Sequence, residues 1–202
     1  MKTKMKLLVF AGVTAIFLSF AFKPISDKKI IVIDAGHGGK DLGATIDGEQ
    51  EKLIVENIAQ KINKLNQNNT VEIILLRQGD NYLELKERID KTNSINPSLF
   101  ISLHINSSKN RDDNGTCAYV SNKNDFYDQS LYFAKNLLES MSGINLAKGE
   151  VKDGNFYVIK NAKCPAVLLE IGYLSNPEDN KFISSENGQN EIAVKIFDFI
   201  NQ

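Results

Sequence analysis

The sequence has few of the residues that usually bind transition metals, and no excess of either charge. Its 202 residues include two histidines, His37 and His104, and two cysteines, Cys117 and Cys164. The net charge is −1, so no basic surface points to nucleic acid as a partner. Hydrophobic residues make up 42% and charged residues 24%, as in an ordinary globular protein with one sizeable core.

The two cysteines leave the redox state open. An even pair can form a disulfide in an oxidising compartment. Each cysteine, however, lies beside a predicted strand, and free cysteine is common in protein interiors. The sequence does not fix the distance between the two Cα atoms, on which a disulfide depends.

One long uncharged run occurs near the N-terminus, from Leu7 to Phe22. Three lysines precede this run and Lys23 ends it, and it is short for a membrane-spanning helix. The pattern is typical of a secretory signal. We therefore expect residues 1–26 to be a secretory signal, and residues 27–202 to form an exported domain in the periplasm or at the cell envelope. An uncleaved membrane anchor is the alternative for residues 1–26.

The rest of the chain alternates between short apolar runs and amphipathic segments. Apolar runs rich in β-branched residues predict strands, and apolar residues three or four positions apart predict helices. We expect strands at 30–34, 71–76, 99–103, 116–120, 156–159 and 166–169, and helices at 51–65, 83–92, around 131–141 and around 192–200. This alternation predicts a single α/β domain with a largely parallel or mixed central sheet and helices on both faces.

Four polar side chains lie near the ends of these elements. His37 follows the first strand within a glycine-rich loop, His104 directly follows the strand at 99–103, and Glu170 follows the last strand. Glu51 begins the helix after the glycine-rich loop. The carboxyl ends of parallel strands meet at one edge of a sheet, where ligands bind. We therefore expect the four groups to lie together.

These residue types are suited to zinc chemistry. Zinc binds imidazole nitrogen and carboxylate oxygen, and a catalytic site keeps one position for water. His37, His104 and Glu51 supply such a set, with Glu49 competing for the third position. Glu170, on an apolar strand, suits a general base in the hydrolysis of a carbonyl bond. Structural histidines, and a carboxylate that caps the turn after its strand, are the competing interpretations.

Substrate-binding residues are less evident. Arg77 is a candidate because a guanidinium group can bind a carboxylate through two hydrogen bonds, and the same holds for Arg88. An ion pair with Asp80 or Glu84 is the explanation that we prefer for both arginines. Asn106, just beyond the third strand, is a second candidate.

Other interpretations of the glycine-rich loop fail on spacing. A phosphate-binding Walker loop requires Ser or Thr after Gly39-Lys40, where this chain has Asp41. A dinucleotide fingerprint starting at Gly36 requires its third glycine at the same position. The segment His37-Gly38-Gly39 is similar to an esterase oxyanion loop, but the chain has no Gly-x-Ser-x-Gly.

Four blocks resemble, in order, the motifs of zinc-dependent N-acetylmuramoyl-L-alanine amidases of the Amidase_3 type. They are IVIDAGHGGKDLGA at 31–44, Glu51-Lys52, FISLHINS at 100–107 and PAVLLEIGYLSN at 165–176. The resemblance covers about residues 29–202 and favours Glu51 over Glu49 as the third metal ligand. Ala35 departs from the pattern, because the family usually has proline there.

The resemblance implies a hydrolase that cleaves the amide bond between N-acetylmuramic acid and the L-alanine of the stem peptide in peptidoglycan. It implies Zn²⁺ bound by His37, Glu51 and His104, with Glu170 as the catalytic residue. A zinc peptidase acting within stem peptides, and a non-catalytic wall-binding module on the same fold, are the alternatives. The sequence does not say whether an activator protein is needed.

Overall fold

The computed structural model describes residues 28–67 and 71–202. The predicted secretory signal or anchor at residues 1–26 lies outside these residues. Within them, no helix is both long enough and apolar enough to cross a membrane.

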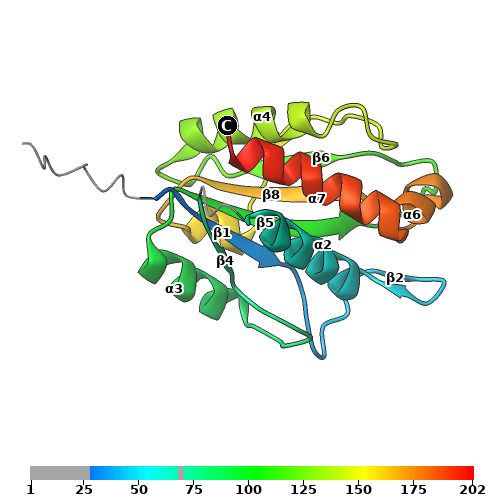
Figure 1. Cartoon of the computed structure of the whole chain (residues 1–202), viewed down its shortest axis with the longest axis horizontal. Helices are drawn as coiled ribbons and strands as arrows, with labels where there is room; N and C mark the ends of the chain where they lie inside the picture. Colours follow the sequence, from blue (N-terminus) through cyan, green and yellow to red (C-terminus); the bar gives the residue numbers. More distant parts are fainter. Residues whose placement is uncertain (1–27, 68–70) are drawn as a thin grey trace, which may run out of the picture.

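A six-stranded sheet forms the centre of the described part of the chain, in the order β4-β1-β5-β8-β6-β7 (Figure 1). β4, β1, β5 and β8 are parallel to one another, whereas β6 pairs with β8 in the antiparallel sense and β7 runs parallel to β6. The strands are β1 (Ile30–Ala35), β4 (Glu72–Leu75), β5 (Leu99–Asn106), β6 (Cys117–Val120), β7 (Val151–Asp153) and β8 (Ala166–Tyr173). The predicted mixed sheet of a single α/β domain is confirmed.

Helices cover both faces of this sheet. One face packs against α2 (Glu51–Leu65), α4 (Tyr127–Ser140) and α7 (Glu186–Ile200), and the other against α3 (Leu85–Ile95) and α5 (Tyr157–Asn161) (Figure 1). In β1, Ile31 and Ile33 belong to the core on the α2 side and Val32 to the core on the α3 side, and all three are fully buried. A central strand with two buried faces has to be apolar at successive positions, which explains the apolar run from Ile30 to Ile33.

The structure corrects one predicted element and adds others. The strand predicted at 156–159 is wrong: this segment begins the short helix α5. Val158 and Ile159 are both buried between exposed Tyr157 and Lys160, a helical pattern of burial rather than a strand's alternation. Helix α6 (Pro177–Ile183) is not among the predicted elements, although Asn176 caps it by accepting hydrogen bonds from two backbone N–H groups.

The glycine-rich segment contains a small hairpin that was also missed. β2 (Thr45–Ile46) pairs with β3 (Glu49–Gln50), and the hairpin projects beside the start of α2 (Figure 1). Cys117 and Cys164 are both free and buried, so the two thiols are not joined in a disulfide.

Candidate metal centre

Three strand ends and one helix start meet at the carboxyl edge of the parallel strands. His104 on β5 and Glu170 on β8 are partners in the register of two adjacent strands. His37 lies two residues beyond β1, and Glu51 is the first residue of α2. All four side chains line one cavity.

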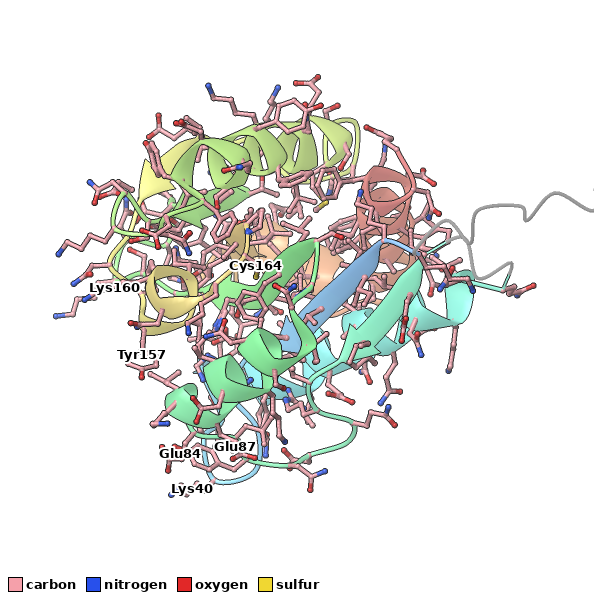
Figure 2. The ribbon with its side chains drawn as sticks, turned by 90° about the vertical axis from the view of Figure 1, so that its left-hand side faces the viewer. Lys40, Glu84, Glu87, Tyr157, Lys160 and Cys164 are labelled. Atoms are coloured by element: carbon pink, nitrogen blue, oxygen red, sulfur yellow. The ribbon has the colours of Figure 1, made fainter. Side chains whose placement is uncertain are left out.

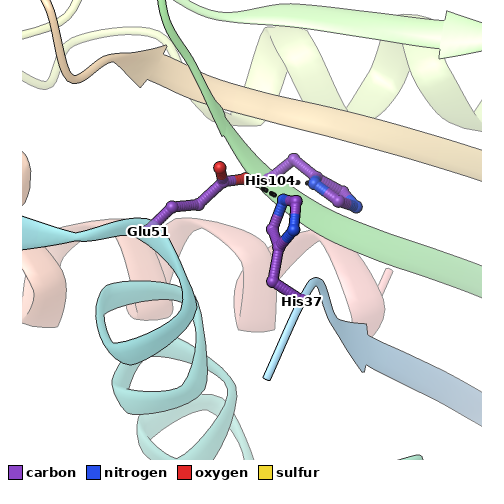
Figure 3. Close-up of side chains that lie close together, drawn as sticks. All are labelled: His37, Glu51 and His104. Carbon is purple, nitrogen blue, oxygen red and sulfur yellow. Dashed lines mark hydrogen bonds and ion pairs between the residues drawn. The ribbon is translucent and has the colours of Figure 1, made fainter. Parts of the chain in front are cut away.

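His37, Glu51 and His104 converge on a shared point (Figure 3). Glu51 Oε1 lies 3.0 Å from His37 Nε2 and 3.0 Å from His104 Nδ1. One ligand atom from each residue lies within 4.8 Å of those of the other two. The two imidazole rings stand nearly perpendicular, with their centroids 4.9 Å apart and an interplanar angle of 79°. Backbone groups orient the carboxylate of Glu51, because Ile105 N–H donates to Oε1 and Ala44 N–H donates to Oε2.

An unusual backbone conformation presents the ring of His37. His37 has φ of 60°, in the left-handed region that residues other than glycine seldom adopt. Gly38 and Gly39, which follow it, have φ of 121° and 56°. Glycine adopts such angles at little steric cost, so the pair allows the chain to turn sharply after the ring.

Two buried arginines hold this turn through its carbonyl groups. Arg77 donates to the carbonyls of Ala35 and Gly36, both at 2.9 Å, and Arg88 donates to those of Ala35 (2.9 Å) and His37. Three successive carbonyls therefore point at two guanidinium groups. This network can hold His37 in its strained conformation, because charged donors form the stronger class of hydrogen bond.

The cluster perturbs the acidity of its own members. Burial lowers the pKa of His37, but hydrogen bonds with Glu51 and Asp41 outweigh burial and raise it to about 8. Burial alone would raise the pKa of Glu51, but hydrogen bonds from His104 and His37 hold it well below its usual range. Glu51 is therefore a carboxylate at neutral pH, as a metal ligand must be.

Glu170 differs from Glu51 in its surroundings. Burial raises the pKa of the Glu170 carboxyl group to about 7. Its Oε2 atom is buried and makes no hydrogen bond with the described residues. A buried carboxyl group that titrates near neutrality and has a free oxygen fits a group that accepts and releases a proton.

The cavity that contains these groups has a volume of about 720 Å³. His37, Glu51, His104 and Glu170 form part of its wall. The start of α3 and the start of α5 form another part. Leu85, Phe156 and Tyr157 contribute partly exposed apolar side chains there. Figure 2 views the molecule from the side where α3 and α5 cover the sheet, with Glu84 and Tyr157 labelled near the ends of the two helices.

Comparisons with known proteins agree with this architecture. The Amidase_3 profile, described as N-acetylmuramoyl-L-alanine amidase, matches residues 31–202. The chain belongs to the Amidase_3 family.

Two solved structures and one curated relative illustrate the similarity. The catalytic domain of CwlV, an N-acetylmuramoyl-L-alanine amidase from Bacillus (Paenibacillus) polymyxa var. colistinus, is 35% identical with a TM-score of 0.79, over 85% of this chain and 96% of CwlV's. An N-acetylmuramoyl-L-alanine amidase from Clostridium difficile 630 is 28% identical with a TM-score of 0.81, over 87% and 96%. The N-acetylmuramoyl-L-alanine amidase LytC of Bacillus subtilis is 34% identical over 176 residues, which are 83% of this chain and 34% of LytC.

The donor set of this Amidase_3 chain fits a zinc ion. Two imidazole nitrogens and one carboxylate oxygen are a known ligand set of catalytic zinc. Ligands at about 2.0–2.2 Å from one ion lie roughly 3.3–3.6 Å from each other in a tetrahedral arrangement. The separations of 3.0 Å between Glu51 Oε1 and the two nitrogens are therefore close to those that a shared ion requires. Glu49, the competing ligand from the sequence, is exposed on the hairpin and is not part of the cluster.

The two predicted substrate-binding residues differ in position. Asn106 lines the cavity, and its contact with substrate stays a prediction. Arg77 does not line the cavity and is buried in an ion pair with Glu56, 2.6 Å away, rather than with Asp80 or Glu84. Its position beneath the glycine-rich loop therefore corrects the predicted substrate contact.

Arg88 is also committed to other protein groups. It forms a buried ion pair with Asp34, although the sequence analysis had named Asp80 or Glu84 as its partner. The second oxygen of Asp34 accepts a hydrogen bond of 2.9 Å from Ser102 Oγ. Ser102 precedes His104 by two residues on β5, so this chain of contacts joins the His37 loop to the strand that carries His104.

Asp41 lines the same cavity and was not among the residues predicted for the site. Asp41 Oδ2 lies 2.9 Å from His37 Nδ1, on the far side of the ring from Glu51. A carboxylate within a few residues of a metal-binding histidine is a signal that could have found it, since such histidines usually bond a second group.

Proposed function

We propose that this chain is a zinc-dependent hydrolase that cleaves the amide bond between N-acetylmuramic acid and L-alanine in peptidoglycan. The observation that carries the proposal is the convergence of His37, Glu51 and His104 beside Glu170 within an Amidase_3 domain. The first three residues would hold the ion, and Glu170 would act as the general base.

A bound zinc ion would supply Lewis acidity, which polarises the scissile carbonyl and lowers the pKa of water. The chain's own residues would move the proton. Glu170 would accept a proton from the attacking water as the oxygen bonds to the carbonyl carbon. It would then donate that proton to the nitrogen as the C–N bond breaks. The products are a carboxyl group on the muramic acid side chain and a free amino group on L-alanine.

The environment of Glu170 supports this assignment. A general base works best when its pKa lies near the working pH, and burial raises the pKa of this carboxyl group to about 7. Glu170 lines the cavity that contains His37, Glu51 and His104, and its Oε2 atom makes no hydrogen bond with the described residues. A base committed to a structural ion pair would have no free oxygen for this role.

The cavity also supports a substrate with both polar and apolar parts. Asn106 and Ser107 line one part of it, and Leu85 and Phe156 line another. Such a mixed lining suits a peptide joined to a sugar. We further propose that residues 1–26 direct the domain to the cell envelope, where peptidoglycan lies.

One experiment tests the metal and the bond together. The purified chain is incubated with purified sacculi, with and without a zinc chelator, and mass spectrometry identifies the released fragments. We expect intact stem peptides that begin with a free L-alanine amino group, and no release in chelator. Fragments cut within the stem would favour the peptidase alternative. Binding to sacculi without any release would favour the wall-binding module. Undiminished release in chelator would contradict the metal mechanism.

A further inference from the structure

Asp41 contacts the ring nitrogen of His37 that points away from Glu51. Asp41 Oδ2 lies 2.9 Å from His37 Nδ1, while Nε2 of the same ring lies 3.0 Å from Glu51 Oε1. The imidazole thus stands between two carboxylates, and only one of them belongs to the cluster. Asp41 is therefore placed to act on the cluster through the ring of His37.

The turn that follows His37 sets the position of Asp41. Gly38 and Asp41 exchange two backbone hydrogen bonds, of 2.9 and 3.1 Å, which close a tight turn. The second carboxylate oxygen, Oδ1, accepts a hydrogen bond of 3.1 Å from Gly43 N–H. Asp41 therefore has little freedom to leave the ring, although its side chain is 46% exposed.

The chemistry of this pair decides which nitrogen of His37 can bind a metal. An ionised carboxylate accepts hydrogen bonds and donates none, so the nitrogen facing Asp41 has to carry the proton. Nε2 faces the second carboxylate, Glu51, and a metal bound at Nε2 would displace the proton between them. The one proton left on the ring would then stay on Nδ1, facing Asp41. The carboxylate also makes the imidazole a stronger ligand.

We propose that Asp41 is a positioning residue that fixes the tautomer and orientation of His37 and thereby sets the affinity of the metal site. This inference rests on the proposed function, because it requires that the cluster bind zinc. His104 is held differently: its ring packs on Gly36, where an added Cβ would lie 2.4 Å from Cε1. Outside the cluster, His37 thus has a hydrogen-bond partner in Asp41, and the ring of His104 packs on Gly36.

A second carboxylate offers a matched control, because it supports the same loop without touching the ring. Asp80 Oδ1 accepts a hydrogen bond of 2.7 Å from Gly39 N–H, and Oδ2 lies 2.7 Å from Lys52 Nζ. Asp41 and Asp80 both hold backbone N–H groups of the glycine-rich loop. If Asp41 served the loop alone, removing either carboxylate would have a similar effect on the cluster.

The test compares Asp41→Ala, Asp41→Asn and Asp80→Asn with the natural chain. Each purified protein is stripped of metal, and its zinc affinity is measured by competition with a chromophoric chelator. We expect Asp41→Ala to bind zinc 10- to 100-fold more weakly, the usual cost of losing such a partner. Asp41→Asn serves if the alanine variant does not fold. Its side-chain oxygen can accept from either His37 or Gly43 but not from both, so we expect an intermediate loss. Asp80→Asn should stay within threefold of the natural chain.

A spectroscopic readout separates the tautomer from a loss of loop structure. ¹⁵N NMR of the metal-stripped proteins, at a pH well above the pKa of His37, distinguishes protonated Nδ1 from protonated Nε2 in the neutral ring. We expect an Nδ1–H signal in the natural chain and in Asp80→Asn, and Nε2–H alone in Asp41→Ala, where Glu51 is the one carboxylate left against the ring. Equal zinc affinities for the Asp41 and Asp80 variants would overturn the inference while leaving the proposed function intact. A natural chain that binds no zinc would overturn both.

Discussion

His104 and Glu170 lie opposite each other in the register of β5 and β8, the two adjacent parallel strands at the centre of the sheet. One supplies a nitrogen to the cluster of His37, Glu51 and His104, and the other has a carboxyl oxygen without a hydrogen-bond partner among the described residues. Paired strands are among the most rigid elements of a fold, so the separation of these two groups is fixed by backbone hydrogen bonds. When two groups act on the same bond of a substrate, such fixed placement speeds the reaction.

The first prediction separates catalysis from metal binding. Glu170→Gln keeps the size of the side chain but cannot accept the proton of water. We expect turnover on sacculi to fall by about 10²–10⁴-fold, while the variant still binds one zinc ion per chain. Glu49→Gln is the matched control, because it removes the same charge from the exposed hairpin. Loss of zinc from the Glu170 variant would mean that Glu170 is a ligand.

We expect Glu170→Gln to lower turnover but to raise the stability of the fold, and the gain in stability depends on pH. Burial raises the pKa of Glu170 from 4.5 in the unfolded chain to about 7 in the folded one. Between these pH values Glu170 is ionised in the unfolded chain and protonated in the folded chain. Raising the pH therefore lowers the free energy of unfolding of the natural protein. This decrease is complete above about pH 7.

We therefore expect Glu170→Gln to stabilise the metal-stripped protein at pH 8 by about 1–3 kcal/mol, and to change it little at pH 4.5. Urea denaturation of both proteins in chelator at the two pH values measures the difference. An equal effect at both values would mean that Glu170 is not perturbed by burial.

Most strands and helices could be predicted from local sequence patterns, and particular elements show why. β1 and β5 have two buried faces, and each begins with successive apolar residues, at 30–33 and 99–101, as expected for a buried strand. The strand predicted at 156–159 was wrong because four apolar or aromatic residues are too few to distinguish a strand from one turn of helix. In the structure α5 packs against α3 and β8, and such tertiary contacts are not visible in a local sequence pattern.

The site was predictable where it depends on strand order and not where it depends on side-chain partners. His37 follows β1, and His104 and Glu170 lie near the carboxyl ends of β5 and β8, which extend past the predicted strand ends. Parallel strands bring their carboxyl ends together. The partners of Arg77 and Arg88 were wrong, because Asp80 and Glu84 are near in sequence whereas Glu56 and Asp34 are near in space. Both arginines were expected at the surface, but they are buried in the structure. A local sequence pattern does not show such burial.

The third prediction concerns Arg77, whose role the structure changes from substrate contact to support of the loop. Arg77→Ala would leave Glu56 buried without its partner and would remove the donor to Ala35 and Gly36. We expect a loss of about 3–5 kcal/mol in the free energy of unfolding, measured with urea. Lys86→Ala, which removes an exposed cation from α3, should leave stability nearly unchanged. A variant with natural stability but a raised KM would instead favour the substrate contact.

The last prediction tests the placement of the His104 ring. Gly36 packs so closely against this ring that a Cβ would lie 2.4 Å from Cε1 and 2.7 Å from Nε2. An imidazole is rigid, so Gly36→Ala has to displace the ring or the loop, and a shift of a few tenths of an ångström already disturbs a metal ligand. We expect this variant to lose most of its zinc affinity and its activity on sacculi.

Gly48→Ala is the control for backbone effects. Gly48 has φ of 88° on the hairpin, and nothing lies within 4 Å of an added Cβ. Alanine there is strained by its backbone angle but touches no ligand, so it should lower stability by about 1 kcal/mol and leave zinc binding unchanged. Comparing zinc affinity and urea denaturation for the two variants separates a displaced ligand from a weakened fold. If Gly36→Ala bound zinc as tightly as Gly48→Ala, the ring of His104 would not rest on Gly36, and packing could not be what holds this ligand in place.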